Sequence, residues 1–203
     1  MNIYLNDPLW IASQVFAFFA LIFSVWAFQV KKKIKLLLLT GIFSMFLAIS
    51  ASFLANYTLA VLFGLAAIRN YVFCYLDWRV SKGKKVPKWL QYSFAVVFAV
   101  ATITATAMLW RFGMALWLEV FICLTLLGLI VGNILPGTNL MRVSFIANRA
   151  FNIVNHVYFN NIIAVIIAVC AIGSNVIYYI RQLVIWLKKR NNLKKQQTID
   201  MEK

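Results

Sequence analysis

The chain has 203 residues, of which 64% are hydrophobic and only 12% are charged. Soluble globular domains carry about 25% charged residues, so this composition excludes an ordinary soluble domain. The net charge of +15 would suit a soluble nucleic-acid binder, but here the basic residues flank long apolar segments. We interpret them as topology determinants that face anionic lipid head groups, and no nucleic-acid partner is expected.

Seven long apolar segments follow one another along the chain. A run of about 18 apolar residues crosses a bilayer as a helix, because the backbone in hydrocarbon must satisfy its own hydrogen bonds. The sequence therefore predicts an all-α polytopic membrane protein with seven transmembrane helices in a single membrane domain, residues 1–203. The predicted helices cover residues 9–30, 36–54, 58–78, 90–110, 114–135, 141–158 and 162–186, and residues 187–203 form a basic tail.

Short polar breaks separate the apolar segments, and the basic residues fall almost entirely in alternate breaks. The breaks after the first, third and fifth segments, together with the tail, hold sixteen lysines and arginines, whereas the opposite side holds only Arg111. Cytoplasmic loops are enriched in these residues, so the N-terminus is predicted outside and the tail in the cytoplasm. This arrangement requires an odd number of spans, and seven satisfies it.

A weak internal repeat relates the two ends of the chain. With a displacement of 104 residues, 58–75 aligns with 162–179 and six of eighteen positions are identical. The alignment predicts a 3+1+3 layout, in which 9–78 is the first three-helix half, 90–110 a linker helix and 114–186 the second half. A separation of four spans gives the halves the same orientation. In transporters with parallel repeats, the substrate site lies between the halves near the midplane.

Charged side chains inside apolar segments are costly in a bilayer, so each one predicts a specific role. Arg69 and Arg149 lie near the middle of the third and sixth segments, and Glu119 lies in the outer part of the fifth. These residues suggest a shared ion-pair cluster. Two interpretations stay open for it: a structural pair that fixes helix packing, or a site that contacts an anionic or polar ligand.

The sixth segment carries the densest polar stripe. Asn148, Asn152 and Asn155 share one helical face through their i, i+4, i+7 spacing, and Arg149 and His156 flank them. Lipid would not tolerate this face, so we expect it to meet protein or water, either through hydrogen bonds between helices or as the lining of a cavity. His156 is the only histidine, and no cluster of metal ligands accompanies it, although a proton relay at His156 stays open.

Asn70 and Asn175 lie at similar depth in the third and seventh segments, and their carboxamides offer both donors and acceptors to one polar ligand. Hydrogen bonding between helices is the alternative. Gly128 and Gly132 form a GxxxG pattern that favours close packing within the bundle, while a homo-oligomer is left open. The sequence lacks catalytic and phosphate-binding motifs, so no enzymatic activity, cofactor or metal is predicted.

Several local patterns resemble the YgjV-type bacterial inner-membrane proteins. They are Gln14, the AIRN stretch at 67–70, the FNIVNH stretch at 151–156 and the SNVI stretch at 174–177 with Arg181 beyond it. The resemblance covers about residues 10–185. It implies a multi-pass protein of the bacterial inner membrane and does not imply any particular activity.

The 3+1+3 layout is also similar to the sugar-transporting SWEET and PQ-loop group, in which asparagines on the third and seventh helices face the substrate. Asn70 and Asn175 match those placements by helix and depth, although the group's proline-glutamine signature is missing. This fold-level likeness predicts a transporter or facilitator of a small polar metabolite, with the asparagines holding the ligand and Arg69, Arg149 and Glu119 setting the cavity charge. The alternative is a non-transporting membrane protein, receptor-like or structural, that acts through its basic cytoplasmic face.

Overall fold

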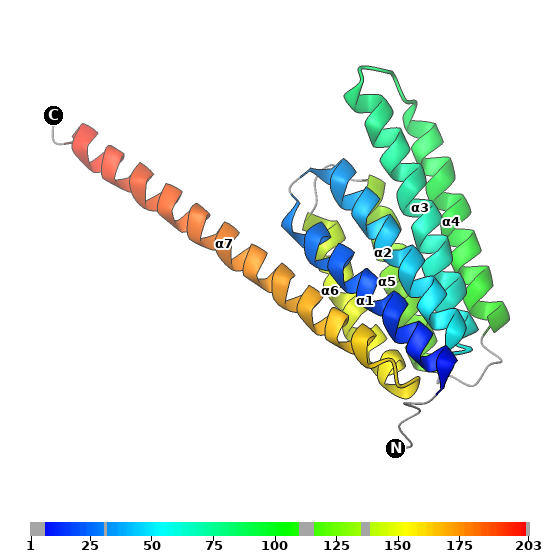
Figure 1. The fold of residues 1–203 in the computed structure, drawn as a ribbon. Helices are drawn as coiled ribbons and strands as arrows, with labels where there is room; N and C mark the ends of the chain where they lie inside the picture. Colours follow the sequence, from blue (N-terminus) through cyan, green and yellow to red (C-terminus); the bar gives the residue numbers. More distant parts are fainter. Residues whose placement is uncertain (1–6, 31, 110–115, 135–138, 202–203) are drawn as a thin grey trace.

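The computed structural model describes residues 7–30, 32–109, 116–134 and 139–201, and these ranges contain seven helices (Figure 1). Six of the helices agree with the predicted segments to within three residues at either end. The helices are α1 (Pro8–Gln29), α2 (Lys33–Phe53), α3 (Tyr57–Ser81), α4 (Lys88–Leu109), α5 (Leu116–Ile134), α6 (Asn139–Tyr158) and α7 (Ile162–Met201).

The seventh helix is longer than predicted, because the segment expected to form a tail after residue 186 continues the helix to Met201. The sequence contains no glycine or proline after Gly173, and the lysines, arginines and glutamines that follow are good helix formers. A helix rises 1.5 Å per residue, so these 40 residues extend about 60 Å, twice the thickness of a hydrocarbon core. The basic end of α7 therefore projects away from the other helices (Figure 1).

Successive helices pack against one another, and α7 also packs against α1, so the helices close into a ring. The fourth helix lies between α3 and α5, the place expected of a linker helix. One core cluster includes Leu36, Phe73, Ile122 and Phe145, which come from four helices. This core holds helices from both ends of the chain together.

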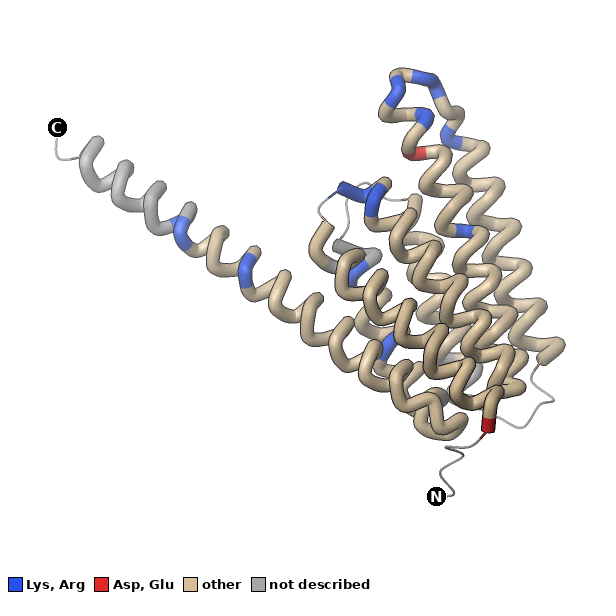
Figure 2. Tube along the Cα trace, viewed as in Figure 1, with Lys and Arg blue, Asp and Glu red and all other residues tan. Residues whose placement is uncertain are grey.

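The distribution of apolar and basic residues is that of a polytopic membrane protein. Five helices, namely α1, α2, α3, α4 and α7, are long and apolar enough to cross a membrane. The apolar stretch found in α5, Ile122–Ile134, is shorter. The sixth helix carries the polar stripe, which lowers its hydropathy. Lysines and arginines gather at one end of the ring, at the α1–α2 and α3–α4 turns, where the sequence predicts the cytoplasm (Figure 2).

Three of the six helix ends in α1–α3 recur 105 residues later in α5–α7. The pairs are Gln29 with Ile134, Phe53 with Tyr158, and Tyr57 with Ile162. The turns before α3 and α7 also share their geometry. Ala55 and Asn160 have positive φ angles of 54° and 52°, and the next residues, Asn56 and Asn161, each cap the following helix with the side-chain oxygen.

The burial pattern has the same spacing. In α7 and its cap, the buried residues Asn161, Ala164, Ile167, Ala168, Ala171 and Asn175 each lie 105 residues after a buried residue of α3 or its cap. The recurrence in the structure is thus one residue longer than the displacement of 104 used in the sequence alignment. Identical apolar residues recur by chance, so they report the spacing poorly. Burial reports it better, because a shift of one residue rotates a helix by about 100° and would expose the buried face.

Helices α2 and α3 approach closely at Gly41, where a Cβ atom would lie 2.9 Å from Cε1 of Tyr71. We predict that Gly41→Leu lowers the free energy of unfolding by about 2 kcal/mol, because overpacking a helix contact costs about 1–3 kcal/mol. Gly64→Leu is the matched control, since a Cβ there meets nothing within 4 Å. Unfolding of the purified variants in mixed micelles measures both, and equal losses would contradict the prediction.

Candidate functional site

Arg69 and Asn70 of α3 form the first polar network inside the ring. Both side chains are buried, with 3% and 1% of their surface exposed. Arg69 donates to Oδ1 of Asn70 from Nε at 3.3 Å and from Nη2 at 3.2 Å, and it donates from Nη1 to the carbonyl of Leu126 in α5 at 3.4 Å. Asn70 in turn donates to Thr40 of α2 at 3.3 Å. This network gives the Arg69 charge acceptors on two helices.

Arg142 and Asn175 form a second network, which joins α6, α7 and the end of α1. Arg142 is 1% exposed, and it donates to Oδ1 of Asn175 at 3.3 Å and to the carbonyl of Val30 at 3.2 Å. Its guanidinium lies 4.1 Å from the ring centre of Tyr178. The sequence analysis counts Arg142 with the basic residues that follow the fifth segment. The structure places it in the first turn of α6, where its contacts with α7 and the end of α1 bury the side chain.

The two asparagines expected to hold one ligand are thus placed in separate networks, each bonded to an arginine. Asn70 accepts from Arg69, and Asn175 accepts from Arg142 while donating to the carbonyl of Ala171 at 2.8 Å. They lie 105 residues apart in the sequence. Their predicted role toward a ligand stays a prediction.

Arg149 is the third arginine of the interior, and its surroundings differ from those of the other two. It is 2% exposed and lies at the middle of α6. Its guanidinium lies 4.3 Å from the ring centre of Phe43 in α2 and 5.8 Å from that of Phe63 in α3. Among the described residues, its Nε and Nη1 atoms have no hydrogen-bond acceptor. Aromatic faces attract the charge, but they leave these two donors unsatisfied.

The predicted polar stripe of α6 faces the interior. Asn148 donates to Thr125 of α5 at 2.9 Å and accepts from Asn152 at 3.0 Å. Oδ1 of Asn152 and Nε2 of His156 are buried and lack a partner within the described part of the chain. The imidazole of His156 stacks on Phe63, with ring centres 6.3 Å apart. The stripe therefore combines hydrogen bonds between helices with unsatisfied polar atoms.

Two predicted site residues have side chains that the structure does not describe. The side chains of Glu119 in α5 and Asn155 in α6 are not among the described ones. The expected ion-pair cluster of Glu119 with Arg69 and Arg149 thus stays a prediction. No group of three or more potential metal ligands occurs among the described residues.

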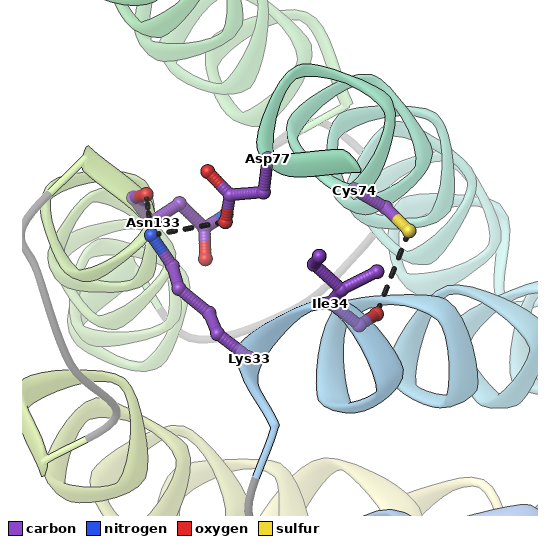
Figure 3. Close-up of polar contacts among 5 residues, drawn as sticks. All are labelled: Lys33, Ile34, Cys74, Asp77 and Asn133. Carbon is purple, nitrogen blue, oxygen red and sulfur yellow. Dashed lines mark hydrogen bonds and ion pairs between the residues drawn. The ribbon is translucent and has the colours of Figure 1, made fainter. Parts of the chain in front are cut away.

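An ion pair that the sequence analysis missed lies at the basic end of the ring (Figure 3). Nζ of Lys33 in α2 lies 3.3 Å from Oδ2 of Asp77 in α3, and it donates to the carbonyl of Asn133 in α5 at 2.7 Å. The link therefore joins α2 and α3 to α5. A signal was present, since Asp77 is the only acidic residue near the predicted cytoplasmic end of any of the seven segments.

A ring of helices around buried arginines and amides defines a class of polytopic helical membrane proteins with a polar interior. The family model of Imp-YgjV, a bacterial inner membrane protein, matches residues 11–184. The chain therefore belongs to this family and to the bacterial inner membrane, which confirms the resemblance seen in the sequence. No curated protein and no solved structure matches the chain.

Proposed function

We propose that this protein is a small carrier or facilitator for a polar metabolite. All seven helices span the membrane, and the N-terminus lies outside. The proposed site is centred on Arg149, Asn152 and His156. One observation carries the proposal: four buried polar atoms of these residues, namely Nε and Nη1 of Arg149, Oδ1 of Asn152 and Nε2 of His156, have no partner among the described residues.

Buried polar atoms without a hydrogen-bond partner destabilise the fold unless water or a ligand supplies that partner. A buried donor or acceptor without a partner costs about 1–3 kcal/mol, and an arginine at the centre of a membrane helix costs about 2.5 kcal/mol or more. The stacking of Arg149 on Phe43 at 4.3 Å offsets part of this cost, since a desolvated cation–π contact contributes about 2 kcal/mol. The remaining cost is offset when water or a polar ligand enters, which supports a binding site over a dry helix contact.

The repeat supports a site between two moving halves. We infer a 3+1+3 parallel repeat, with α1–α3 and α5–α7 as the halves, from the recurrence of helix ends and of buried positions at 105 residues. Arg149 of the second half lies on Phe43 and Phe63 of the first. In repeat-built transporters the halves rock about a site at their interface near the midplane.

Ligand-dependent thermal stability of the purified protein tests the proposal. A ligand that binds only the folded state raises the melting temperature by mass action. Sugars, nucleosides, amino acids, organic acids and vitamins are screened against the wild type, Arg149→Gln and the control Lys188→Gln, which removes an exposed charge. We expect a shift in the wild type and the control that is lost in Arg149→Gln. A shift that survives in Arg149→Gln would place the site elsewhere.

A second prediction separates a carrier from a protein whose polar interior is only structural. In a background without Cys74, Cys123 and Cys170, we expect a cysteine at Asn152 to react with a water-soluble thiol reagent, because a carrier must admit water to its site. A cysteine at Val154, which is 47% exposed on the outer surface of α6, is the lipid-facing control and stays unreactive. Protection of both positions would favour the receptor-like or structural alternative.

A further inference from the structure

A second polar site, separate from the Arg149 site, lies where α7 diverges from the other helices. A cleft of about 340 Å³ opens there at the basic end of the molecule. In Figure 1, α7 runs away from α1 and α6 toward its C-terminus. The cleft is lined by Gln29, Arg142, Ser174, Ile177, Tyr178, Arg181, Gln182 and Ile185.

The lining residues of α7 share one face of that helix. Ser174, Tyr178, Arg181, Gln182 and Ile185 follow one another at intervals of three or four residues or lie adjacent, which is the spacing of a helical stripe. The polar members of the stripe point to the same cleft as Arg142 from α6. Two arginines from different helices therefore line one opening, and no carboxylate is among the described residues that line it.

Arg142 is held in place before any ligand arrives. Its side chain is buried, with hydrogen bonds to Asn175 at 3.3 Å and to the carbonyl of Val30 at 3.2 Å, and Tyr178 lies under its guanidinium at 4.1 Å. Arg181 is exposed, and it makes no ion pair within the described part of the chain. The cleft thus combines a fixed cation with an adjustable one, and both are planar donors suited to an oxyanion.

We propose that this cleft binds a phosphate group, with the two arginines as its ligands and the amides of Gln29 and Gln182 as further donors. Exposed Ile177 and Ile185 beside the arginines offer an apolar surface to acyl chains, so an anionic phospholipid of the cytoplasmic leaflet fits the cleft. Free inorganic phosphate presents the same kind of oxyanion as the lipid head group, so it is the other source of this ligand chemistry. This proposal does not rest on the carrier function, since none of the cleft residues belongs to the Arg149 site.

The test uses the full-length protein in a neutral detergent, with dioleoyl phosphatidylglycerol, dioleoyl phosphatidylcholine or inorganic phosphate as the probe. Melting temperature and retained lipid in native mass spectrometry are measured for the wild type, Arg181→Gln and Arg190→Gln. Arg190 is the matched control, because it is an exposed arginine of the same helix, stacked on Trp186 outside the cleft. Arg181 is exposed too, so its substitution spares the fold.

Phosphatidylglycerol is expected to raise the melting temperature, and Arg181→Gln is expected to weaken its apparent affinity about tenfold while Arg190→Gln changes it less than twofold. Inorganic phosphate that reproduces the whole effect, with the same dependence on Arg181, would support the phosphate site and assign it to a soluble ligand. An equal response to phosphatidylcholine that does not depend on Arg181, or equal losses in the two variants, would overturn the proposal, because the first result reflects acyl packing and the second general charge.

Discussion

Arg149→Met is expected to stabilise the ligand-free fold and to weaken ligand binding. In the absence of ligand, the buried guanidinium has two donors without acceptors among the described residues. Methionine keeps much of its length and apolar contact with Phe43 but carries no charge. Replacing buried charges by apolar residues of similar volume is often neutral or stabilising by about 1–4 kcal/mol, so we expect a gain of about 1–2 kcal/mol.

The same substitution removes the proposed ligand contact, and a hydrogen bond to a charged group contributes about 1.5–3 kcal/mol, so affinity should fall at least about tenfold. The measurements are unfolding without ligand and binding of a compound that stabilises the wild type. A gain in stability joined to a loss of binding is the signature of a site kept for function at a cost to the fold. A fall in stability would show that Arg149 holds helices together, which would contradict the carrier proposal.

Much of the architecture could be predicted from hydropathy alone. In lipid the backbone has no alternative to helix, so long apolar runs and polar breaks place six of the helices to within three residues at either end. The end of α7 could not be placed in this way, because hydropathy locates the bilayer boundary and does not locate the end of a helix. Lys188 lies beyond the predicted span but inside the helix.

The register of the proposed repeat depends on which positions are buried or cap a helix, and residue identity alone does not give this information. Matching Val61 to Val165 favours a displacement of 104, because both residues are apolar filler. The spacing of 105 residues seen in the structure is marked by Asn56 and Asn161, which cap helices, and by Asn70 and Asn175, which are buried. Polar residues in a membrane have few tolerated positions, so they report the register better than aliphatic ones do.

The candidate site was predicted in part for the same reason. The spacing of Asn148 and Asn152 requires a shared face, and the structure buries that face. The partner of each arginine could not be predicted, because contacts between helices depend on how the ring closes. Arg142 bonds to Asn175, 33 residues away, whereas Arg69 bonds to the adjacent Asn70.

Asn70→Ala is expected to lower the free energy of unfolding by about 2–3 kcal/mol, in contrast to the gain expected for Arg149→Met. Oδ1 of Asn70 accepts both Nε and Nη2 of Arg69, so its removal leaves a buried charge with only the carbonyl of Leu126 among its described acceptors. Hydrogen bonds to charged groups contribute about 1.5–3 kcal/mol, and an unsatisfied charged donor costs more than a neutral one.

A double-mutant cycle tests the cause of this loss. With Arg69→Met already in place, Asn70→Ala should cost about 1 kcal/mol or less, because the charge that needed the amide is gone. Asn148→Ala is the matched control, since Asn148 is buried to a similar extent but bonds only neutral groups, Thr125 and Asn152. Its loss should be about 1 kcal/mol. If Asn70 serves only to hold ligand, its removal would leave the stability of the ligand-free protein unchanged, and the cycle would show no coupling to Arg69.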